Sequence, residues 1–188
     1  MGDKSIILVG PRCCGKTSVG MDLSDMLKLP FVDADKEFVK EYSDISSFVK
    51  KYGWPEFRRR ESEIIEKICD EYKSSQIVLT PGGGAVAHDQ GEYYRSKNEK
   101  ILRNFGTIFY LLPSSDLEES ALILAERLKK DSNSLSFRPA LTKESDDYKE
   151  MLQVLQKRHE LYSKAAHKTI FTKRMSIGEI TNCILDIL

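Results

Sequence analysis

Eight residues near the N-terminus constrain the fold more than any other part of the chain. Residues 10–17 read Gly-Pro-Arg-Cys-Cys-Gly-Lys-Thr, which matches the pattern G-x-x-x-x-G-K-[ST] in full. An apolar run at 5–9 precedes the pattern and predicts a strand, and apolar residues at helical spacing in 16–27 predict a helix after it. A strand that turns directly into a helix through a glycine-rich loop is typical of α/β proteins.

This pattern predicts a loop that binds phosphate. Its glycines let the backbone curl so that N–H groups point at a β-phosphate, and the helix N-terminus adds partial positive charge. We expect Lys16 to reach the β and γ oxygens and the Thr17 hydroxyl to ligate Mg²⁺. A chance glycine-rich turn is the alternative, but the flanking strand and helix argue against it. The residues expected to contact nucleotide here are Arg12, Cys13, Cys14, Gly15, Lys16, Thr17 and Ser18.

Short apolar segments alternate with helical segments along the rest of the chain. Further strands are expected at 30–32, 76–80, 107–112 and 167–171, and further helices at 117–130, 145–166 and 176–188. Residues 36–73 look helical with a break near Gly53-Trp54-Pro55. Such alternation predicts a parallel sheet covered on both faces, whose ligands bind beyond the carboxyl ends of the strands. Gly10, Asp33 and Gly82 fall at that edge.

The composition excludes several classes of protein. The 188 residues, 40% hydrophobic and 31% charged, suffice for one compact domain. Lys+Arg and Asp+Glu balance at 29 each, so no net field attracts nucleic acid or an anionic membrane. No apolar stretch approaches the ~20 residues of a membrane span, and no signal peptide is evident. We therefore expect a cytoplasmic protein that binds neither membrane nor nucleic acid.

The four cysteines form no CxxC pair and no disulfide framework, and the histidines do not join them at zinc-ligand spacing. Two interpretations of Cys13 and Cys14 stay open. A thiol at a helix N-terminus beside a lysine is prone to oxidation. Cysteine is also small enough to be a plain loop residue, and we favour this because nothing else in the chain suggests a redox partner.

Five further motifs, together with the phosphate loop, resemble the shikimate kinase family. Each is similar to a family motif: 31–35 (FVDAD) to D-x-D, 57–61 (FRRRE) to F-R-x-x-E, 82–84 to the triple glycine, 137–141 (FRPAL) to the lid motif R-P-L-L, and 158–162 (RHELY) to R-x-x-L-Y. Each motif is weak alone, but together they follow the family's order from Gly10 to Tyr162. No Asn-Lys-x-Asp guanine signature is present, which argues against a GTPase.

The resemblance implies ATP-dependent phosphorylation of the 3-hydroxyl of shikimate, a step of chorismate and aromatic amino acid biosynthesis, with Mg²⁺ as cofactor. It also implies a P-loop kinase fold, a three-layer α/β/α domain over 1–188. The expected five-stranded parallel sheet has the order 2-3-1-4-5, with a substrate-binding region at about 34–62 and a lid at about 131–142. The expected partners are ATP, ADP and shikimate, and the expected state is a monomer.

The resemblance also implies roles for single residues, and the chemistry of the substrate agrees. A carboxylate is gripped best by arginine, so Arg58 and Arg158 take that role. Asp35 would hold two hydroxyls, orient the attacking oxygen and accept its proton. Lys16, Asp35 and Arg138 are thus the expected catalytic residues, with Arg138 in the lid neutralising charge on the γ-phosphate.

The remaining roles are supporting ones. Asp33 would act on Mg²⁺ through water, with Thr17 as the direct ligand. Gly82, Gly83 and Gly84 would let substrate approach the backbone. Arg138 and Arg174 would complete the ATP site, Arg174 at the adenine.

Each assignment has a structural alternative. Asp33 and Asp35 are also suited to cap a helix. Arg58 begins a run of three arginines, which is often a solvated helix face. Arg158 has Glu160 nearby as a partner, and the three glycines also fit a plain loop.

The chain also departs from the family pattern. Cys13 stands where glycine is usual, and Pro81 replaces a small hydroxyl residue. Trp54 replaces the glutamate of a Gly-Glu pair, as a core residue or, less favoured, beside the substrate. The phenylalanine expected beside the shikimate ring is matched only approximately, by Phe48 or Val49.

Two other functions compete with this interpretation. One is a kinase for another small polyol acid such as gluconate, which would share the phosphate loop. The other is a nucleotide-binding protein of the same fold without turnover. The presence of all four key residues argues against a protein without turnover, because a degenerate copy is expected to lose at least one of them. These residues are Lys16, Asp33, Asp35 and Arg138.

Overall fold

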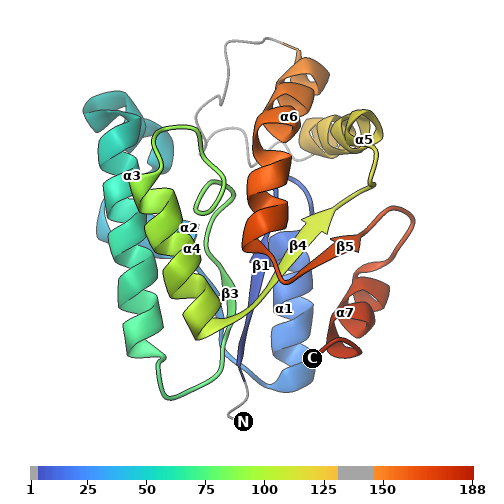
Figure 1. Cartoon of the computed structure of the whole chain (residues 1–188), viewed down its shortest axis with the longest axis horizontal. Coiled ribbons are helices and arrows are strands. Elements are labelled where there is room, and N and C mark those ends of the chain that lie inside the picture. The colour runs from blue at the N-terminus through green and yellow to red at the C-terminus, as the bar shows by residue number, and fades with distance from the viewer. Residues whose placement is uncertain (1–3, 131–145) are drawn as a thin grey trace.

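The computed structural model describes residues 4–130 and 146–188. Within these residues, five parallel strands form one sheet in the order β2-β3-β1-β4-β5, which confirms the expected order (Figure 1). The strands are β1 (Ser5–Val9), β2 (Phe31–Asp33), β3 (Val78–Thr80), β4 (Gly106–Leu112) and β5 (Lys168–Phe171). The helices are α1 (Lys16–Leu27), α2 (Ala34–Glu41), α3 (Ile45–Glu71), α4 (Tyr93–Phe105), α5 (Leu117–Lys130), α6 (Asp147–Ala165) and α7 (Ile177–Leu185).

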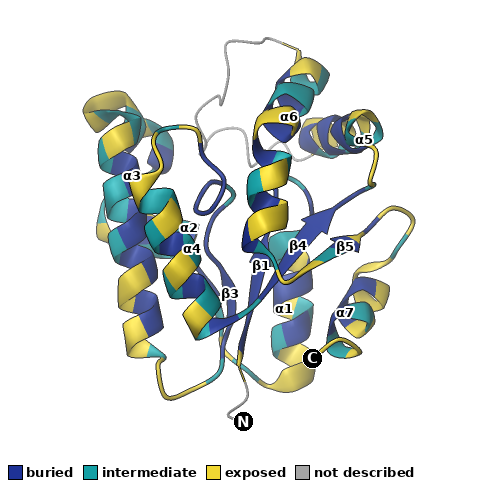
Figure 2. Cartoon of the chain, in the orientation of Figure 1, coloured by how far each residue is buried: buried dark blue, intermediate teal, exposed yellow. Residues whose placement is uncertain are grey.

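The central strand β1 explains why its sequence is apolar without alternation. All five of its residues are buried, and because successive strand residues point to opposite faces, both faces of the sheet are covered (Figure 2). Its neighbour β4 starts with Gly106, paired with Ser5. A Cβ on Gly106 would lie 2.2 Å from the Ser5 carbonyl oxygen, so only glycine permits this pairing.

The segment 36–73 is interrupted twice, not once as expected. The break at Gly53 (φ 81°, ψ 166°) is the expected one. The second separates α2 from α3, where the Asp44 side chain accepts a hydrogen bond from the Ser47 N–H, 2.9 Å away, and caps α3. The rings of Phe38 and Phe48 pack edge to face, 5.0 Å apart, and hold the two helices together.

Helix α4 had no counterpart among the expected elements, because a polar residue on its buried face interrupts the apolar period. The buried position in its middle is Asn98, whose amide donates to the Ala85 carbonyl at 2.9 Å. This hydrogen bond fixes the loop after β3 to the helix. No helix in the described part of the chain is long and apolar enough to cross a membrane.

Candidate active site

Two adjoining pockets lie at the carboxyl ends of the central strands, where the sequence placed them. The larger, about 870 Å³, is lined by the phosphate loop together with Asp33, Thr80 and Gly82. The smaller is lined by residues of α3, α6 and the loop after β3. Both pockets share four lining residues, which are Arg12, Lys16, Asp35 and Ile45. A group bound in one pocket therefore meets a group bound in the other beside Lys16 and Asp35.

The phosphate loop curls through three residues of positive φ, which are Gly10 (146°), Cys13 (59°) and Gly15 (98°). Cys13 is in a backbone region that favours glycine, and its carbonyl accepts a hydrogen bond from Arg127 of α5 at 3.3 Å. Lys16 Nζ donates to the carbonyl oxygens of Gly10 and Pro11 at 2.9 and 2.7 Å, so its ammonium lies across the loop. Cys14 is buried in the core and Cys13 is half-buried, and both line the larger pocket.

The two aspartates after β2 have different local roles. Asp33 is the N-cap of α2, and its Oδ1 accepts the N–H groups of Asp35 and Lys36 at 3.1 and 3.4 Å. The capping alternative therefore holds for Asp33, which also lines the larger pocket. Asp35, in the first turn of α2, lines both pockets. A Cβ on Gly82 (φ 92°) would lie 2.8 Å from Asp35 Oδ1, so glycine leaves the room that this carboxylate occupies.

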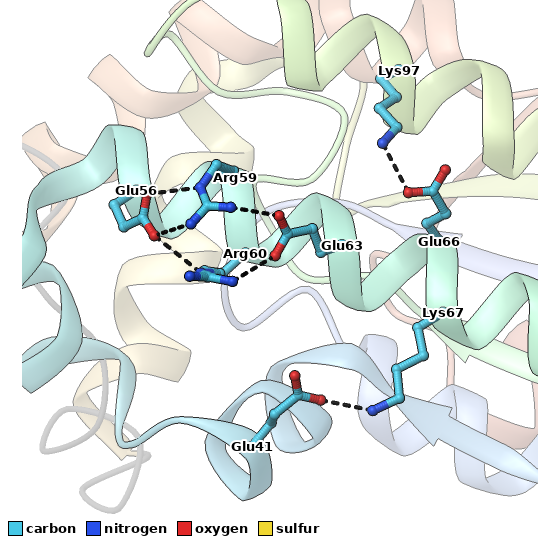
Figure 3. A network of polar contacts seen from close by, with 8 residues as sticks. All are labelled: Glu41, Glu56, Arg59, Arg60, Glu63, Glu66, Lys67 and Lys97. Carbon is cyan, nitrogen blue, oxygen red and sulfur yellow. Dashed lines mark hydrogen bonds and ion pairs between the residues drawn. The ribbon is translucent and has the colours of Figure 1, made fainter.

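The run of three arginines divides between the interior and the surface. Arg59 and Arg60 point outward and share ion pairs of 2.6–3.0 Å with Glu56 and Glu63 (Figure 3). They form the solvated helix face that a charge run predicts. Arg58 does not belong to that face, because it is only 2% exposed and lines the smaller pocket.

Arg58 is held by an acid, an amide and aromatic rings. Its Nη1 donates to the two carboxylate oxygens of Glu61 at 2.9 and 2.7 Å, and its Nε donates to Gln90 Oε1 at 3.2 Å. The guanidinium carbon lies 5.1 Å from the centre of the Trp54 ring and 5.0 Å from that of Phe57. Burial raises the pKa of Glu61, while Arg58 opposes that rise.

Arg158 enters the same pocket from α6 and is 4% exposed. Its ion pair is with Asp89 Oδ1 at 3.6 Å rather than with the neighbouring Glu160. Two buried guanidiniums from different helices thus line one small pocket, an arrangement suited to a carboxylate ligand.

Some site residues were not predicted from the sequence. Trp54 packs against the core, as favoured, and also lines the smaller pocket, while Phe48 is buried outside that lining. Phe57 supplies the aromatic wall instead. Glu61 and Tyr162 also line it, and both belong to quoted motifs in which they had no role. The i, i+3 spacing of Arg58 and Glu61 was the available signal for the first.

The expected site residues gather as follows. The larger pocket is lined by Arg12, Cys13, Cys14, Gly15, Lys16, Thr17, Ser18, Asp33, Asp35 and Gly82. The smaller is lined by Arg12, Lys16, Asp35, Arg58, Gly83, Gly84 and Arg158. Arg174 is exposed, and its neighbour Met175 lines the larger pocket in its place. Arg138 and the expected lid, 131–142, lie outside the described residues.

The oxygen groups of the larger pocket fit a magnesium ion. Thr17, Asp33 and Thr80 all line it, and the buried Thr80 hydroxyl has no partner among the described residues. Mg²⁺ prefers oxygen ligands and keeps several waters and substrate phosphates. A magnesium ion therefore does not require three His, Cys, Asp or Glu side chains around it. The described part of the chain contains no such cluster.

His88 is buried within electrostatic reach of the two buried arginines and should make folding pH-dependent. It is fully buried, and neither ring nitrogen has a partner among the described residues. Burial, reinforced by Arg58, Arg95 and Arg158, lowers its pKa from 6.5 to about 3. Between these values the unfolded chain binds one more proton than the folded chain, so stability falls as pH drops below about 6.5.

At pH 5 this effect should remove about 2 kcal/mol from the free energy of unfolding. Urea unfolding of wild type and of His88→Asn, each at pH 7 and pH 5, measures it. The wild-type loss should exceed that of the variant by this amount. Equal losses in both proteins would contradict the assignment.

The family model, the sequence relatives and a solved structure all show similarity to shikimate kinases. The family model for shikimate kinase matches residues 12–188. Shikimate kinase of Thioalkalivibrio sulfidiphilus is 34% identical over 177 residues, covering 94% of this chain and 82% of that protein. Shikimate kinase 2 of Yersinia enterocolitica is 33% identical, covering 98% and 95%. The solved structure of shikimate kinase from Acinetobacter baumannii in complex with shikimate superposes with a TM-score of 0.80, at 26% identity over 99% of this chain and 93% of that one.

Proposed function

The chain belongs to the shikimate kinase family, and we propose that it transfers the γ-phosphoryl group of ATP to the 3-hydroxyl of shikimate, giving shikimate 3-phosphate and ADP. The observation that carries this proposal is the junction of the two pockets at Lys16 and Asp35. A phosphoryl donor on one side and a hydroxyl acceptor on the other would meet at these two side chains. The product belongs to chorismate and aromatic amino acid biosynthesis.

ATP occupies the larger pocket, with its phosphates against the N–H groups of the loop and the N-terminus of α1. Lys16 exchanges its hydrogen bonds to the Gly10 and Pro11 carbonyls for the phosphate oxygens, so its charge acts on the transferred group. Arg138 neutralises charge on the same group, and Arg174 contacts the adenine.

Shikimate occupies the smaller pocket. Arg58 and Arg158 bind its carboxylate, and the support for this is that two buried guanidiniums line one small space. Trp54 and Phe57 pack against the ring. Asp35 accepts hydrogen bonds from two hydroxyls and takes the proton from the attacking one, for which its position at the junction is suited.

Mg²⁺ is proposed as the cofactor, held directly by Thr17 and through water by Asp33. When bound, it neutralises charge on the phosphates of ATP. The fit of the oxygen groups in the larger pocket supports this assignment.

We further propose that residues 1–188 form one domain, with a substrate-binding region at 34–62 and a lid at 131–142, and that the protein is a cytoplasmic monomer that does not bind nucleic acid. Its four free thiols are in keeping with a reducing compartment, and its balanced charge gives nucleic acid no attraction.

The decisive experiment measures ADP release with Mg²⁺ and ATP in the presence of shikimate, gluconate or quinate. ADP formed with shikimate alone supports the proposal. ADP formed with gluconate instead would identify a kinase for another polyol acid. ATP binding without turnover of any acceptor would indicate a nucleotide-binding protein that has lost catalysis.

Trp54 offers an independent test, because it is the only tryptophan of the chain and lines the smaller pocket. Shikimate should displace water from the indole and shift its emission to shorter wavelength. Gluconate at the same concentration is the matched control and should leave the spectrum unchanged. Emission that does not respond to saturating shikimate would place the acceptor elsewhere.

A further inference from the structure

The hydroxyl of Tyr162 takes no part in the reaction described above, yet it contacts the backbone of the site. Tyr162 is 1% exposed and lies on α6, one helical turn after Arg158. Its hydroxyl donates a hydrogen bond to the Gly83 carbonyl oxygen. Its ring stacks on that of Tyr110, with the centroids 4.9 Å apart and the planes at 23°. Tyr110 pairs with Val9, the residue before the phosphate loop. Tyr162 thus connects α6 to the glycine run 82–84 and, through Tyr110, to the end of β1 where the phosphate loop begins.

A run of three glycines needs an outside group to fix its conformation. No side chain opposes rotation of the peptide plane between Gly83 and Gly84. The hydrogen bond from Tyr162 holds the carbonyl of this peptide. Because C=O and N–H point in opposite directions across a trans peptide, the same bond fixes the direction of the Gly84 N–H. Both glycines line the smaller pocket, so Tyr162 determines which backbone groups face a ligand there.

The same peptide also limits the position of Arg58. A Cβ on Gly84 would lie 2.6 Å from two guanidinium nitrogens of Arg58, so the backbone and the guanidinium are in close contact. Rotation of the Gly83–Gly84 peptide would push backbone atoms toward that guanidinium. Arg158 shares a face of α6 with Tyr162. The positions of both arginines in the pocket therefore depend on how Tyr162 packs against the glycine run.

We propose that Tyr162 is a positioning residue for the phosphoryl acceptor, whose hydroxyl holds the glycine run, and through it Arg58, in the conformation that binds the substrate carboxylate. This inference rests on the proposed function. It predicts an effect on shikimate rather than on ATP, because Tyr162 lines the smaller pocket and, among the described residues, is not part of the lining of the larger one.

The test is Tyr162→Phe, which keeps the ring and its stacking on Tyr110 and removes one oxygen. The half-buried Gly83 carbonyl loses its donor, so the glycine run samples other conformations. We expect the KM for shikimate, and its Kd measured by Trp54 emission, to rise about tenfold, while the KM for ATP stays within about twofold. A residue that only supported folding would lower the amount of active enzyme and leave both KM values unchanged.

Tyr110→Phe is the matched control. It also removes one buried hydroxyl, which contacts His159 Nδ1 at 3.3 Å, but it leaves the bond to Gly83 intact. It should retain the wild-type KM for shikimate. An unchanged shikimate KM in Tyr162→Phe, or equal rises for both substrates, would overturn the proposal.

Two further measurements separate the possible failures. A wild-type enzyme that does not consume shikimate refutes the proposed function and not the role of Tyr162 alone. The NMR shift of the Gly83 carbonyl carbon in wild type needs no variant and covers the case in which Tyr162→Phe does not fold. A downfield shift typical of a carbonyl that accepts a hydrogen bond is expected, and the shift of a carbonyl without a donor would overturn the proposal.

Discussion

Asp35→Asn is expected to lower kcat for shikimate phosphorylation by about 10³-fold, within the 10²–10⁴ range of a lost general base. The substitution keeps the shape of the side chain and removes its charge. The asparagine can still accept a hydrogen bond from a hydroxyl through its amide oxygen, but it cannot take the proton of the attacking hydroxyl. Steady-state ADP release at saturating shikimate and ATP measures the effect.

Asp33→Asn is the matched control for this variant. Asparagine caps helices as well as aspartate does, so the bonds to the Asp35 and Lys36 N–H groups should persist and α2 should remain intact. A smaller loss of kcat, partly restored by higher Mg²⁺, is expected there. If Asp35→Asn keeps more than about a tenth of the wild-type kcat, Asp35 is not the base.

Glu61→Ala is expected to destabilise the protein by about 3–5 kcal/mol, because it leaves the buried Arg58 without its carboxylate. For a chain of this size the melting temperature should fall by about 10 °C. Shikimate binding should weaken as well, because the guanidinium then lacks one of the groups that orient it. Differential scanning calorimetry and the Trp54 emission titration measure the two effects.

Glu63→Ala provides a control on the same helix. Glu63 pairs with Arg59 and Arg60, but its side chain is 41% exposed. Such surface pairs contribute little, so the melting temperature should stay close to that of wild type. Equal melting temperatures for the Glu61 and Glu63 variants would show that burial does not distinguish the two pairs.

The alternation of strands and helices was predicted from the sequence because its determinants are local and strong, whereas the order of the strands was implied by the resemblance to shikimate kinases. The phosphate loop fixes the strand and helix around it, and the short apolar strands mark the rest of the alternation. Helix α4 was missed because Asn98 occupies its buried face, and a polar residue hides the helical period. The break between α2 and α3 was missed because neither glycine nor proline marks it, only the capping Asp44.

The site could be predicted down to motifs but not down to the direction of each side chain. Three adjacent arginines give no indication of which one points inward. The answer follows from the helix, because Arg58, Glu61 and Ile65 lie on one face and Ile65 is fully buried. The contribution of Tyr162 depends on a hydrogen bond to Gly83, 79 positions away in sequence, and no local pattern encodes such a contact.

The central place of β1 in the sheet has a consequence for how the protein is made. β1 leaves the ribosome well before its partner β4, which begins only at Gly106. Until that strand is synthesised, β1 exposes an unpaired edge of apolar residues, which is the kind of surface that aggregates or recruits chaperones. The phosphate loop attached to β1 therefore takes its final shape late in synthesis, and a nascent chain ending before residue 106 should not yet retain ATP.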